Sequence, residues 1–308
     1  MEASGDVINQ TITAVPGVEV GHWTDLGAVT GVTVINLPEP NLAAFEARGG
    51  APGTRETALL APGMKVETIQ SLVFSGGSAF GLAAADGVMR ELAAIGRGHP
   101  TSAGPVPIVP AAIIYDLFLG ENSPPTAEHG AAAFRACSAA PAELGSVGAG
   151  TGATVSKWSG IESMRKSGVG SAAVRVGTAT LGVLAVVNAV GAIVDLRGNW
   201  ITGGPTLAAP VVEGFRENTT LVAVATDARL SKSGLLRLIV RSHDALAACI
   251  RPAHTRYDGD IVFAVACGEE DGDMDLLGES AFNVTAAAII SAVMNATSLA
   301  GIPAVGDG

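Results

Sequence analysis

The chain has 308 residues, of which 48% are hydrophobic and 4% aromatic, so it is long enough to bury a core made mostly of Ala, Val, Leu and Ile. The formal net charge of −11 argues against a nucleic acid or an anionic membrane as partner, because both require clustered Lys and Arg. A charged fraction of only 15% at this hydrophobicity excludes a disordered chain.

The beginning of the sequence shows no basic segment followed by an apolar one, so we expect no signal peptide. Apolar runs are interrupted by Gly and Asn before they reach the length of a bilayer span. Three widely separated cysteines, Cys137, Cys249 and Cys267, offer no disulfide framework and no CxxC metal pair. Together these features predict a soluble, cytoplasmic protein with reduced thiols.

In the first half of the chain, short strands separated by glycine turns are predicted over residues 18–37, and a buried strand over residues 71–75. A helix is predicted over residues 79–95, because its helix-forming residues are followed by two glycines. Three prolines then predict an extended passage before a second helix at residues 127–139.

The second half opens with strands and closes with a helix. Strands are predicted over residues 174–187, 192–196, 221–225 and 261–266, and helices over residues 235–250 and 281–299. Residues 205–218 form a polar, irregular approach to the strand that follows them. Strands arrive in groups with helices between the groups, which favours an α+β layered fold over regular βαβ winding.

Two adjacent glycines, Gly76 and Gly77, follow the strand at residues 71–75 and precede the first helix. One interpretation is a tight turn whose amides only begin the helix. The other is that these free amides bind an oxyanion or a substrate carboxylate. A second glycine cluster at residues 148–153 fits GxGxxG/A, but its flanks form neither a good strand nor a good helix, which argues against a dinucleotide site.

The segment at residues 254–260 reads HTRYDGD and gathers His254, Asp258 and Asp260. An imidazole and two carboxylates could ligate a divalent metal, although the other four histidines show no partner spacing. Asp-Gly-Asp before a strand is also a common turn, and the two carboxylates could form a catalytic acid pair. The residues by themselves leave these three interpretations open.

Asn218 and Thr219 stand directly before the strand at residues 221–225. The simplest interpretation is a polar turn that enters a strand. If Thr219 instead attacks the carbonyl of Asn218, an N→O acyl shift followed by hydrolysis frees the α-amine of Thr219. An α-amine has an unperturbed pKa of about 7.7–8.0, so it is suited to deprotonate the neighbouring hydroxyl at neutral pH.

Several distinctive stretches occur in a fixed order along nearly the whole chain. They are residues 15–22 (VPGVEVGH), 48–56 (RGGAPGTRE), 75–82 (SGGSAFGL), 105–110 (PVPIVP) leading to 114–117 (IYDL), 218–220 (NTT) leading to 225–228 (ATDA), and 258–260 (DGD). This pattern resembles the DmpA-type aminopeptidase family of self-processing N-terminal-nucleophile hydrolases, which includes the nylon-oligomer hydrolase NylC.

The resemblance implies an αββα-like sandwich, in which two central β-sheets are flanked by helices, as a single hydrolase domain over residues 1–308. It implies self-cleavage into an α fragment, residues 1–218, and a β fragment, residues 219–308, with Thr219 as the nucleophile. The family's other site residues then fall on Lys157 and Asn188 as helpers, on Asp258 and Asp260 as the acidic pair, and on Tyr115 near the pocket.

Threonine after asparagine is closer to the nylon-oligomer hydrolase than to the many relatives that use serine, whereas the region before the cut looks shorter than in that enzyme. The resemblance also implies a homo-oligomer, a tetramer or larger, without metal or other cofactor. We therefore expect an amide hydrolase acting on short peptides, amino-acid amides or linear oligomers such as those of 6-aminohexanoate (nylon-6).

Two alternatives of other classes stay open at this point. One is a metal-dependent hydrolase built on His254, Asp258 and Asp260. The other is a non-enzymatic small-molecule binding protein that uses the Gly76-Gly77 turn.

Overall fold

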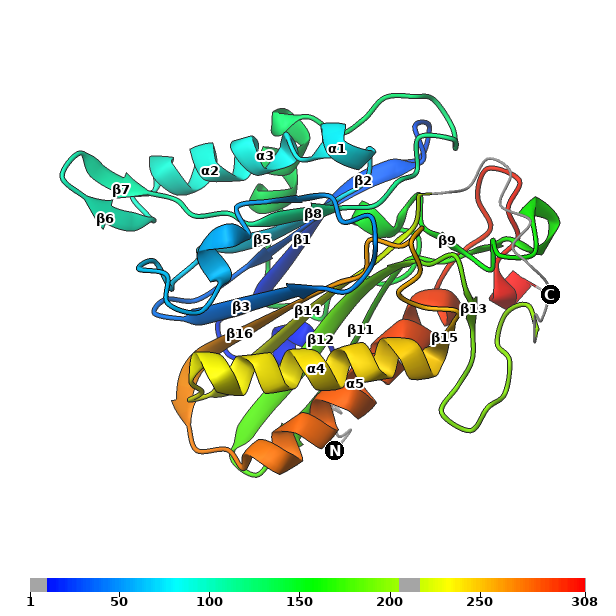
Figure 1. Cartoon of the computed structure of the whole chain (residues 1–308). Coiled ribbons are helices and arrows are strands. Elements are labelled where there is room, and N and C mark those ends of the chain that lie inside the picture. The colour runs from blue at the N-terminus through cyan, green and yellow to red at the C-terminus, as the bar shows by residue number, and fades with distance from the viewer. Residues whose placement is uncertain (1–9, 205–216, 308) are drawn as a thin grey trace, which may run out of the picture.

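The structure, a computed structural model, describes residues 10–204 and 217–307, which form four layers (Figure 1). Helices cover one β-sheet, that sheet packs on a second β-sheet, and two long helices cover the outer face of the second sheet. The expected αββα arrangement is therefore confirmed.

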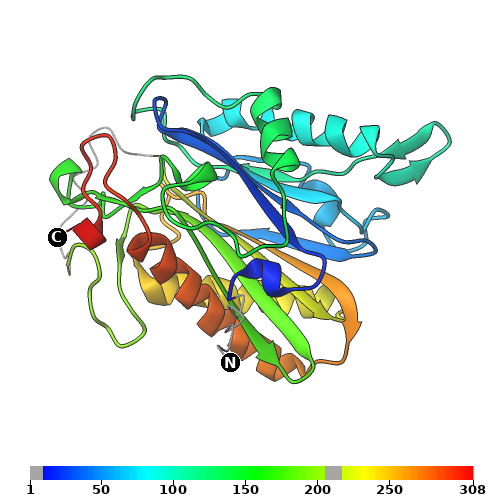
Figure 2. The ribbon, with the colours of Figure 1, turned by 180° about the vertical axis from the view of Figure 1, so that it is seen from behind.

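The first sheet has the strand order β1-β2-β5-β8-β4. Its strands are β1 (Glu19–Asp25), β2 (Thr30–Asn36), β5 (Ser71–Ser75), β8 (Ala111–Ile113) and β4 (Thr54–Arg55). The helices on its outer side are α1 (Ser78–Gly81), α2 (Ala84–Ala94) and α3 (Ala127–Arg135). Figure 2 shows α3 lying against β1 and β2 on the side hidden in Figure 1.

The second sheet has the strand order β11-β12-β14-β16-β3. Its strands are β11 (Val169–Val176), β12 (Ala179–Asn188), β14 (Thr219–Ala228), β16 (Ile261–Glu270) and β3 (Leu42–Ala47). Strands β14 and β16 are parallel, and the other neighbours are antiparallel. All residues of β12 and β14 are buried, because these central strands are covered on both faces, which explains their continuous apolar sequence.

The outer face of the second sheet is covered by α4 (Lys232–Cys249) and α5 (Met274–Met294). Helix α5 is apolar and long enough, by length and composition, to cross a membrane. In the fold, however, 56% of its most apolar window is buried, and it packs against α4, β11 and β12. Its apolar composition is thus that of a core helix.

Short elements complete the chain. They are the pairs β6 (His99–Thr101) with β7 (Gly104–Val106), β9 (Thr154–Val155) with β10 (Arg165–Lys166), and β13 (Ala192–Ile193) with β15 (Ile250–Arg251), and the 3₁₀ turns Ile12–Ala14, Ala58–Leu60, Gly148–Gly150, Ile161–Ser163 and Val305–Asp307.

Aliphatic side chains from the inner faces of both sheets interdigitate around Phe74 and Phe263, whose ring centroids are 6.0 Å apart. Two further clusters lie between the sheets and their covering helices. Few aromatic residues are needed because Ala, Val, Leu and Ile make up most of these three core clusters, as the composition predicts.

The structure corrects several predicted boundaries. The run over residues 174–187 contains two strands, β11 and β12, joined at Gly177, whose φ of 64° makes the reversal. The helix predicted over residues 79–95 is divided into α1 and α2, and α3 ends at Arg135, four residues earlier than predicted. Most of the predicted irregular stretch at residues 205–218 lies outside the described residues.

Candidate active site

The topology of the second sheet brings Asn188, Thr219 and Asp260 to one edge. Strands β14 and β16 are parallel, so both begin there, while β12 runs antiparallel to β14 and ends there. Asn188 is the register partner of Thr219, and an isolated bridge pairs Asn218 with Asp258. Residues from three distant parts of the sequence therefore meet because of strand order.

Thr219 is only 2% exposed, and its hydroxyl lies at the carbonyl of the preceding residue. Thr219 Oγ1 donates a hydrogen bond to the carbonyl oxygen of Asn218. The backbone N–H of Gly259 donates to the same oxygen at 2.7 Å. Two donors on one buried carbonyl polarise it and stabilise negative charge that develops on its oxygen.

Position 259 has no room for a side chain. An ideal Cβ on Gly259 would lie 2.7 Å from Thr219 Oγ1 and 2.6 Å from the carbonyl oxygen of Ala51. The glycine of the Asp-Gly-Asp motif therefore allows the turn to approach the Thr219 hydroxyl closely.

The side chain of Asn188 is fixed by three partners. Its Oδ1 accepts from Lys157 Nζ at 2.8 Å and from the backbone N–H of Thr154 at 3.0 Å. Its Nδ2 donates to the backbone carbonyl of Tyr115 at 3.1 Å. Because each atom of the amide has partners of the right polarity, this orientation leaves one Nδ2 hydrogen for a further acceptor.

Lys157 follows β9 and is 1% exposed. Burial lowers the pKa of Lys157 to about 7; the nearby carboxylate of Asp258 opposes this shift, and the second buried lysine, Lys166, adds to it. Lys157 therefore exchanges its proton near neutral pH, unlike a surface lysine.

The two carboxylates of the Asp-Gly-Asp motif are both buried and both accept hydrogen bonds. Asp258 accepts from the backbone N–H of Val190 at 3.2 Å and from the amide and hydroxyl of Thr255 at 3.1 and 2.6 Å. Burial, reinforced by the charge of Asp260, raises the pKa of Asp258.

Asp260 binds the strand that carries Thr219. Its Oδ1 accepts from the backbone N–H of Thr220 at 2.8 Å. Its Oδ2 accepts from the backbone N–H and from Nδ1 of His254, at 3.0 and 2.8 Å. The carboxylate thus ties the start of β14 to the loop before β16.

The RGGAPGTRE stretch begins with a strap that covers the Asp-Gly-Asp turn. The amides of Arg48 and Gly49 donate to the carbonyl of Asp260 at 3.0 and 3.3 Å, and the amide of Ala51 donates to that of Asp258 at 2.9 Å. A Cβ on Gly49 would lie 2.3 Å from the backbone of both aspartates. Close backbone packing explains the glycine at position 49.

The structure does not support the predicted role of Gly76 and Gly77. The N–H of Gly76 donates to the carbonyl of Gly31 at 2.9 Å, and that of Gly77 donates to Asp116 Oδ1 at 2.7 Å. Because both amides already have acceptors within the protein, they are not free to bind an oxyanion. The turn instead binds the buried carboxylate of Asp116, whose Oδ2 accepts a hydrogen bond from the Thr30 hydroxyl at 2.7 Å.

Tyr115 contributes its backbone to this region. Its carbonyl accepts from Asn188, and its ring stacks on Phe118 with centroids 6.0 Å apart. Phe118 in turn lines an apolar pocket of about 400 Å³, together with Met164 and Ile302. Contact of Tyr115 with a substrate stays a prediction.

A second lysine, at position 166, is buried although the sequence does not indicate it. Lys166 is fully buried, and its Nζ donates to the carbonyls of Thr151 and Ala153 at 2.7 and 2.8 Å. Burial lowers its pKa to about 7, against the opposing charge of Asp116, whose own pKa burial raises to about 6. Lys166 holds the segment that leads into Lys157, and an Arg-Lys pair in the sequence gives no sign of this burial.

Within residues 10–204 and 217–307 there is no group of three or more His, Cys, Asp or Glu side chains that could hold a metal ion. His254, Asp258 and Asp260 do lie together, but His254 and Asp260 bind each other, and Asp258 accepts from Thr255 and Val190. No observation therefore favours the metal-dependent alternative.

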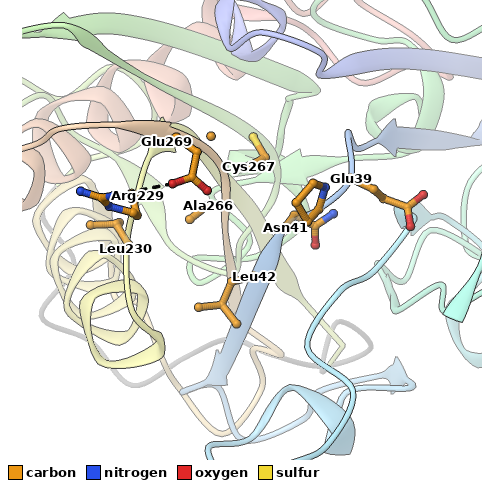
Figure 3. A pocket seen from close by; sticks show the side chains of 10 residues that line it. Glu39, Asn41, Leu42, Arg229, Leu230, Ala266, Cys267 and Glu269 are labelled. Atoms are coloured by element: carbon orange, nitrogen blue, oxygen red, sulfur yellow. Dashed lines mark ion pairs between the residues drawn. The ribbon is translucent and has the colours of Figure 1, made fainter. Parts of the chain in front are cut away.

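The pocket in Figure 3, of about 270 Å³, lies at the other end of the second sheet. Arg229, which lines it, directly follows the last residue of β14, whereas Thr219 is the first. The thiol in this pocket is that of Cys267. Burial raises its pKa to about 12, so it is not a nucleophile at neutral pH. We therefore do not assign the chemistry to this pocket.

Comparison with curated proteins finds relatives over most of the chain. A protein of Mycobacterium tuberculosis named as an uncharacterized aminopeptidase is 40% identical, with 96% of this chain and 97% of the relative covered. The 6-aminohexanoate-oligomer endohydrolase of Paenarthrobacter ureafaciens is 33% identical, with 83% of this chain and 74% of the relative covered.

Solved structures with the same fold include a β-aminopeptidase from Burkholderia sp., with a TM-score of 0.76, 22% identity and coverage of 97% of this chain and 91% of that one. The L-aminopeptidase D-Ala-esterase/amidase of Ochrobactrum anthropi, described as a variant of the Ntn hydrolase fold, has a TM-score of 0.76 and 20% identity, with 96% and 88% covered. Residues 10–305 match peptidase family S58. The chain belongs to this family and is an enzyme that hydrolyses amide bonds.

Proposed function

We propose that the protein is a self-cleaving amide hydrolase whose nucleophile is Thr219, released by cleavage of the Asn218–Thr219 peptide bond. The observation that carries this proposal is the shared oxygen of Asn218. This carbonyl oxygen accepts hydrogen bonds from the hydroxyl of Thr219, which is the attacking group, and from the backbone N–H of Gly259, and the site is buried. The nucleophile and an oxyanion donor are thus both at the bond to be broken.

Self-cleavage follows in two steps. Thr219 Oγ1 bonds to the carbonyl carbon of Asn218, the hydroxyl proton is removed, and the C–N bond breaks as the nitrogen takes up a proton. Water then hydrolyses the ester, leaving a carboxylate on Asn218 and a free α-amine and hydroxyl on Thr219. Gly259 N–H stabilises the oxyanion in the first step.

Before cleavage the nitrogen of Thr219 is an amide and cannot act as a base. Lys157 is the group suited to receive the hydroxyl proton, because its pKa of about 7 leaves a neutral fraction at neutral pH. Lys157 Nζ is hydrogen-bonded to Oδ1 of Asn188, the register partner of Thr219.

In turnover, the Thr219 hydroxyl attacks the substrate carbonyl, and the free α-amine takes the proton and delivers it to the leaving amine. Water then hydrolyses the acyl-enzyme ester. We assign Asn188 Nδ2 as a donor to the substrate oxyanion, because one of its two hydrogens is not used by Tyr115. Asp258 and Asp260 hold the surrounding backbone.

The substrate class is short peptides, amino-acid amides or linear amide oligomers. The relatives named as an aminopeptidase and as a 6-aminohexanoate-oligomer endohydrolase support this class. The apolar pocket beside Phe118 supports an aliphatic segment in the substrate.

The test is the intact mass of purified protein under denaturing conditions. We expect two species of roughly 22 and 9 kDa, in proportion to residues 1–218 and 219–308 of the 30.7 kDa chain, and the smaller one must begin Thr219-Thr220-Leu221. Thr219→Ala should stay in one piece and be inactive, whereas Thr219→Ser keeps a hydroxyl and should still be cut. Hydrolytic activity in an uncut Thr219→Ala protein would refute the assignment.

A further inference from the structure

His254 has an unusual backbone conformation that one carboxylate holds in place. Its φ of 55° lies in the left-handed region, which residues with a side chain adopt rarely. Asp260 Oδ2 accepts from both the backbone N–H and Nδ1 of His254, at 3.0 and 2.8 Å. Strained backbone of this kind concentrates at functional sites and persists where surrounding contacts determine it.

The other oxygen of the same carboxylate reaches the nucleophile strand. Asp260 Oδ1 accepts from the backbone N–H of Thr220 at 2.8 Å, one residue after Thr219. Asp260 is 1% exposed and accepts three N–H groups in total, two of them from His254. Its carboxylate is therefore occupied by positioning contacts, and its orientation depends on His254.

The imidazole of His254 packs edge-on against the buried ring of His243. Its centroid lies 4.9 Å from that of His243, at an interplanar angle of 73°. His243 is 1% exposed, and its Nε2 is 3.3 Å from the carbonyl oxygen of Glu46. A carbonyl only accepts, so that nitrogen carries the hydrogen of His243.

The protonation of the His254 ring follows in the same way. Because it faces the carboxylate of Asp260, which only accepts, Nδ1 carries a hydrogen. Among the described residues Nε2 of His254 has no hydrogen-bond partner, so Nδ1 is the ring atom that bonds to the site.

We propose that His254 is a positioning residue, which orients the carboxylate of Asp260 and thereby fixes the Thr220 amide and the Thr219 hydroxyl at the start of β14. This inference rests on the function proposed above. Without the Nδ1 donor, the Asp260 carboxylate keeps only the backbone N–H groups of His254 and Thr220 as donors and is held less tightly. Thr219 then loses part of its alignment with the Asn218 carbonyl before the cut and with a substrate carbonyl after it. Misalignment slows both reactions.

Three variants separate the donor from the backbone. His254→Asn keeps an N–H donor close to the position of Nδ1, and asparagine tolerates the left-handed conformation. His254→Ala removes the donor and keeps the strain, whereas His254→Gly removes both. His99→Ala, on the distant β6–β7 hairpin, is the control for loss of a histidine.

The measurements are the first-order rate of self-cleavage after synthesis and, for the cut protein, kcat and KM separately. We expect the Ala and Gly variants to be cut at least tenfold more slowly and to lose kcat by a similar factor with little change in KM. The Asn variant should stay within about threefold of the wild type, and His99→Ala should match it. A role in folding alone would change the melting temperature without this separation of kcat from KM.

The outcomes distinguish this inference from the function on which it rests. A wild-type chain that is never cut overturns both. If the wild type is cut and His254→Ala is cut equally fast, only the role of His254 is wrong. Full rescue by glycine would assign the effect to backbone conformation, and failure of asparagine would assign it to the rest of the ring; either result overturns the positioning role.

Discussion

Asn188 and Thr219 are register partners at the last rung of the antiparallel β12–β14 ladder. One strand ends where the other begins, so the amide side chain and the hydroxyl leave the sheet at the same edge. Lys157 is attached to this pair through Asn188 Oδ1, at 2.8 Å.

Asn188→Ala should lower kcat by about 100- to 1000-fold, because it removes a proposed oxyanion donor. It also leaves the buried ammonium of Lys157 and the N–H of Thr154 without Oδ1, which should cost about 1–3 kcal/mol of unfolding free energy. Steady-state kinetics and urea unfolding measure the two effects.

Asn188→Asp is the matched variant, because it keeps an acceptor for Lys157 but has no N–H to donate. It should lose turnover as the alanine variant does, while Lys157 keeps its partner. Normal turnover by the aspartate variant would show that Asn188 is not an oxyanion donor.

Gly259→Ala should slow self-cleavage by about 100-fold, because the new Cβ would meet Thr219 Oγ1 at 2.7 Å and displace it. The fraction of uncut chain over time, followed by denaturing electrophoresis, gives the rate. Gly204→Ala is the control, because no heavy atom of residues 10–204 or 217–307 lies within 4 Å of a Cβ built there and its φ is not in the left-handed region. Equal cleavage rates for the two variants would mean that the turn does not approach the hydroxyl closely.

The stability of the protein should rise with pH above neutrality through Lys166. Its folded pKa of about 7 lies below the ordinary value of 10.5, so between these values the unfolded chain binds more protons than the folded one. Stability therefore increases as pH rises through this window, by up to about 1.4 kcal/mol per pH unit from this group.

Lys166→Met removes that titration. The unfolding free energy of the wild type minus that of the variant should be flat below pH 7 and should rise between pH 7 and 10. Urea unfolding at one-unit pH intervals measures this difference, and parallel curves for the two proteins would refute a buried lysine with a lowered pKa.

Treatment with a chelator should leave activity unchanged. His254 and Asp260 bind each other, and Asp258 binds Thr255, so these side chains are engaged within the protein. Activity after dialysis against EDTA, with metal content measured in parallel, checks this expectation. Loss of activity that Zn²⁺ restores would favour the metal-dependent alternative instead.

The sequence predicted the strands better than the turns that connect them. The strand at residues 71–75 matches β5, and the strands at residues 221–225 and 261–266 are the cores of β14 and β16. Continuous apolar runs identify strands buried on both faces. The turn at Gly177 was not predicted, because β-branched residues continue on both sides of it, from β11 into β12.

For the site, the sequence supplied individual residues but not their connections. The family resemblance pointed to Lys157 and Asn188, which the structure does bring together at 2.8 Å. Burial of Lys166 depends on its bonds to the carbonyls of Thr151 and Ala153, and the bond from Thr220 to Asp260 joins segments that are 40 residues apart. No local pattern of residue types predicts such contacts, since each of these side chains is ordinary at the surface.

The strand order of the second sheet has a consequence for the chain after a cut at Asn218. The two strands that the segment from Thr219 onward contributes to this sheet, β14 and β16, lie between β12 on one side and β3 on the other. The fragments would be interlocked, with the shorter one bordered on both sides by strands of the longer one. Cutting the backbone would create a new chain end inside an intact sheet, and the two pieces should separate only when the sheet itself unfolds.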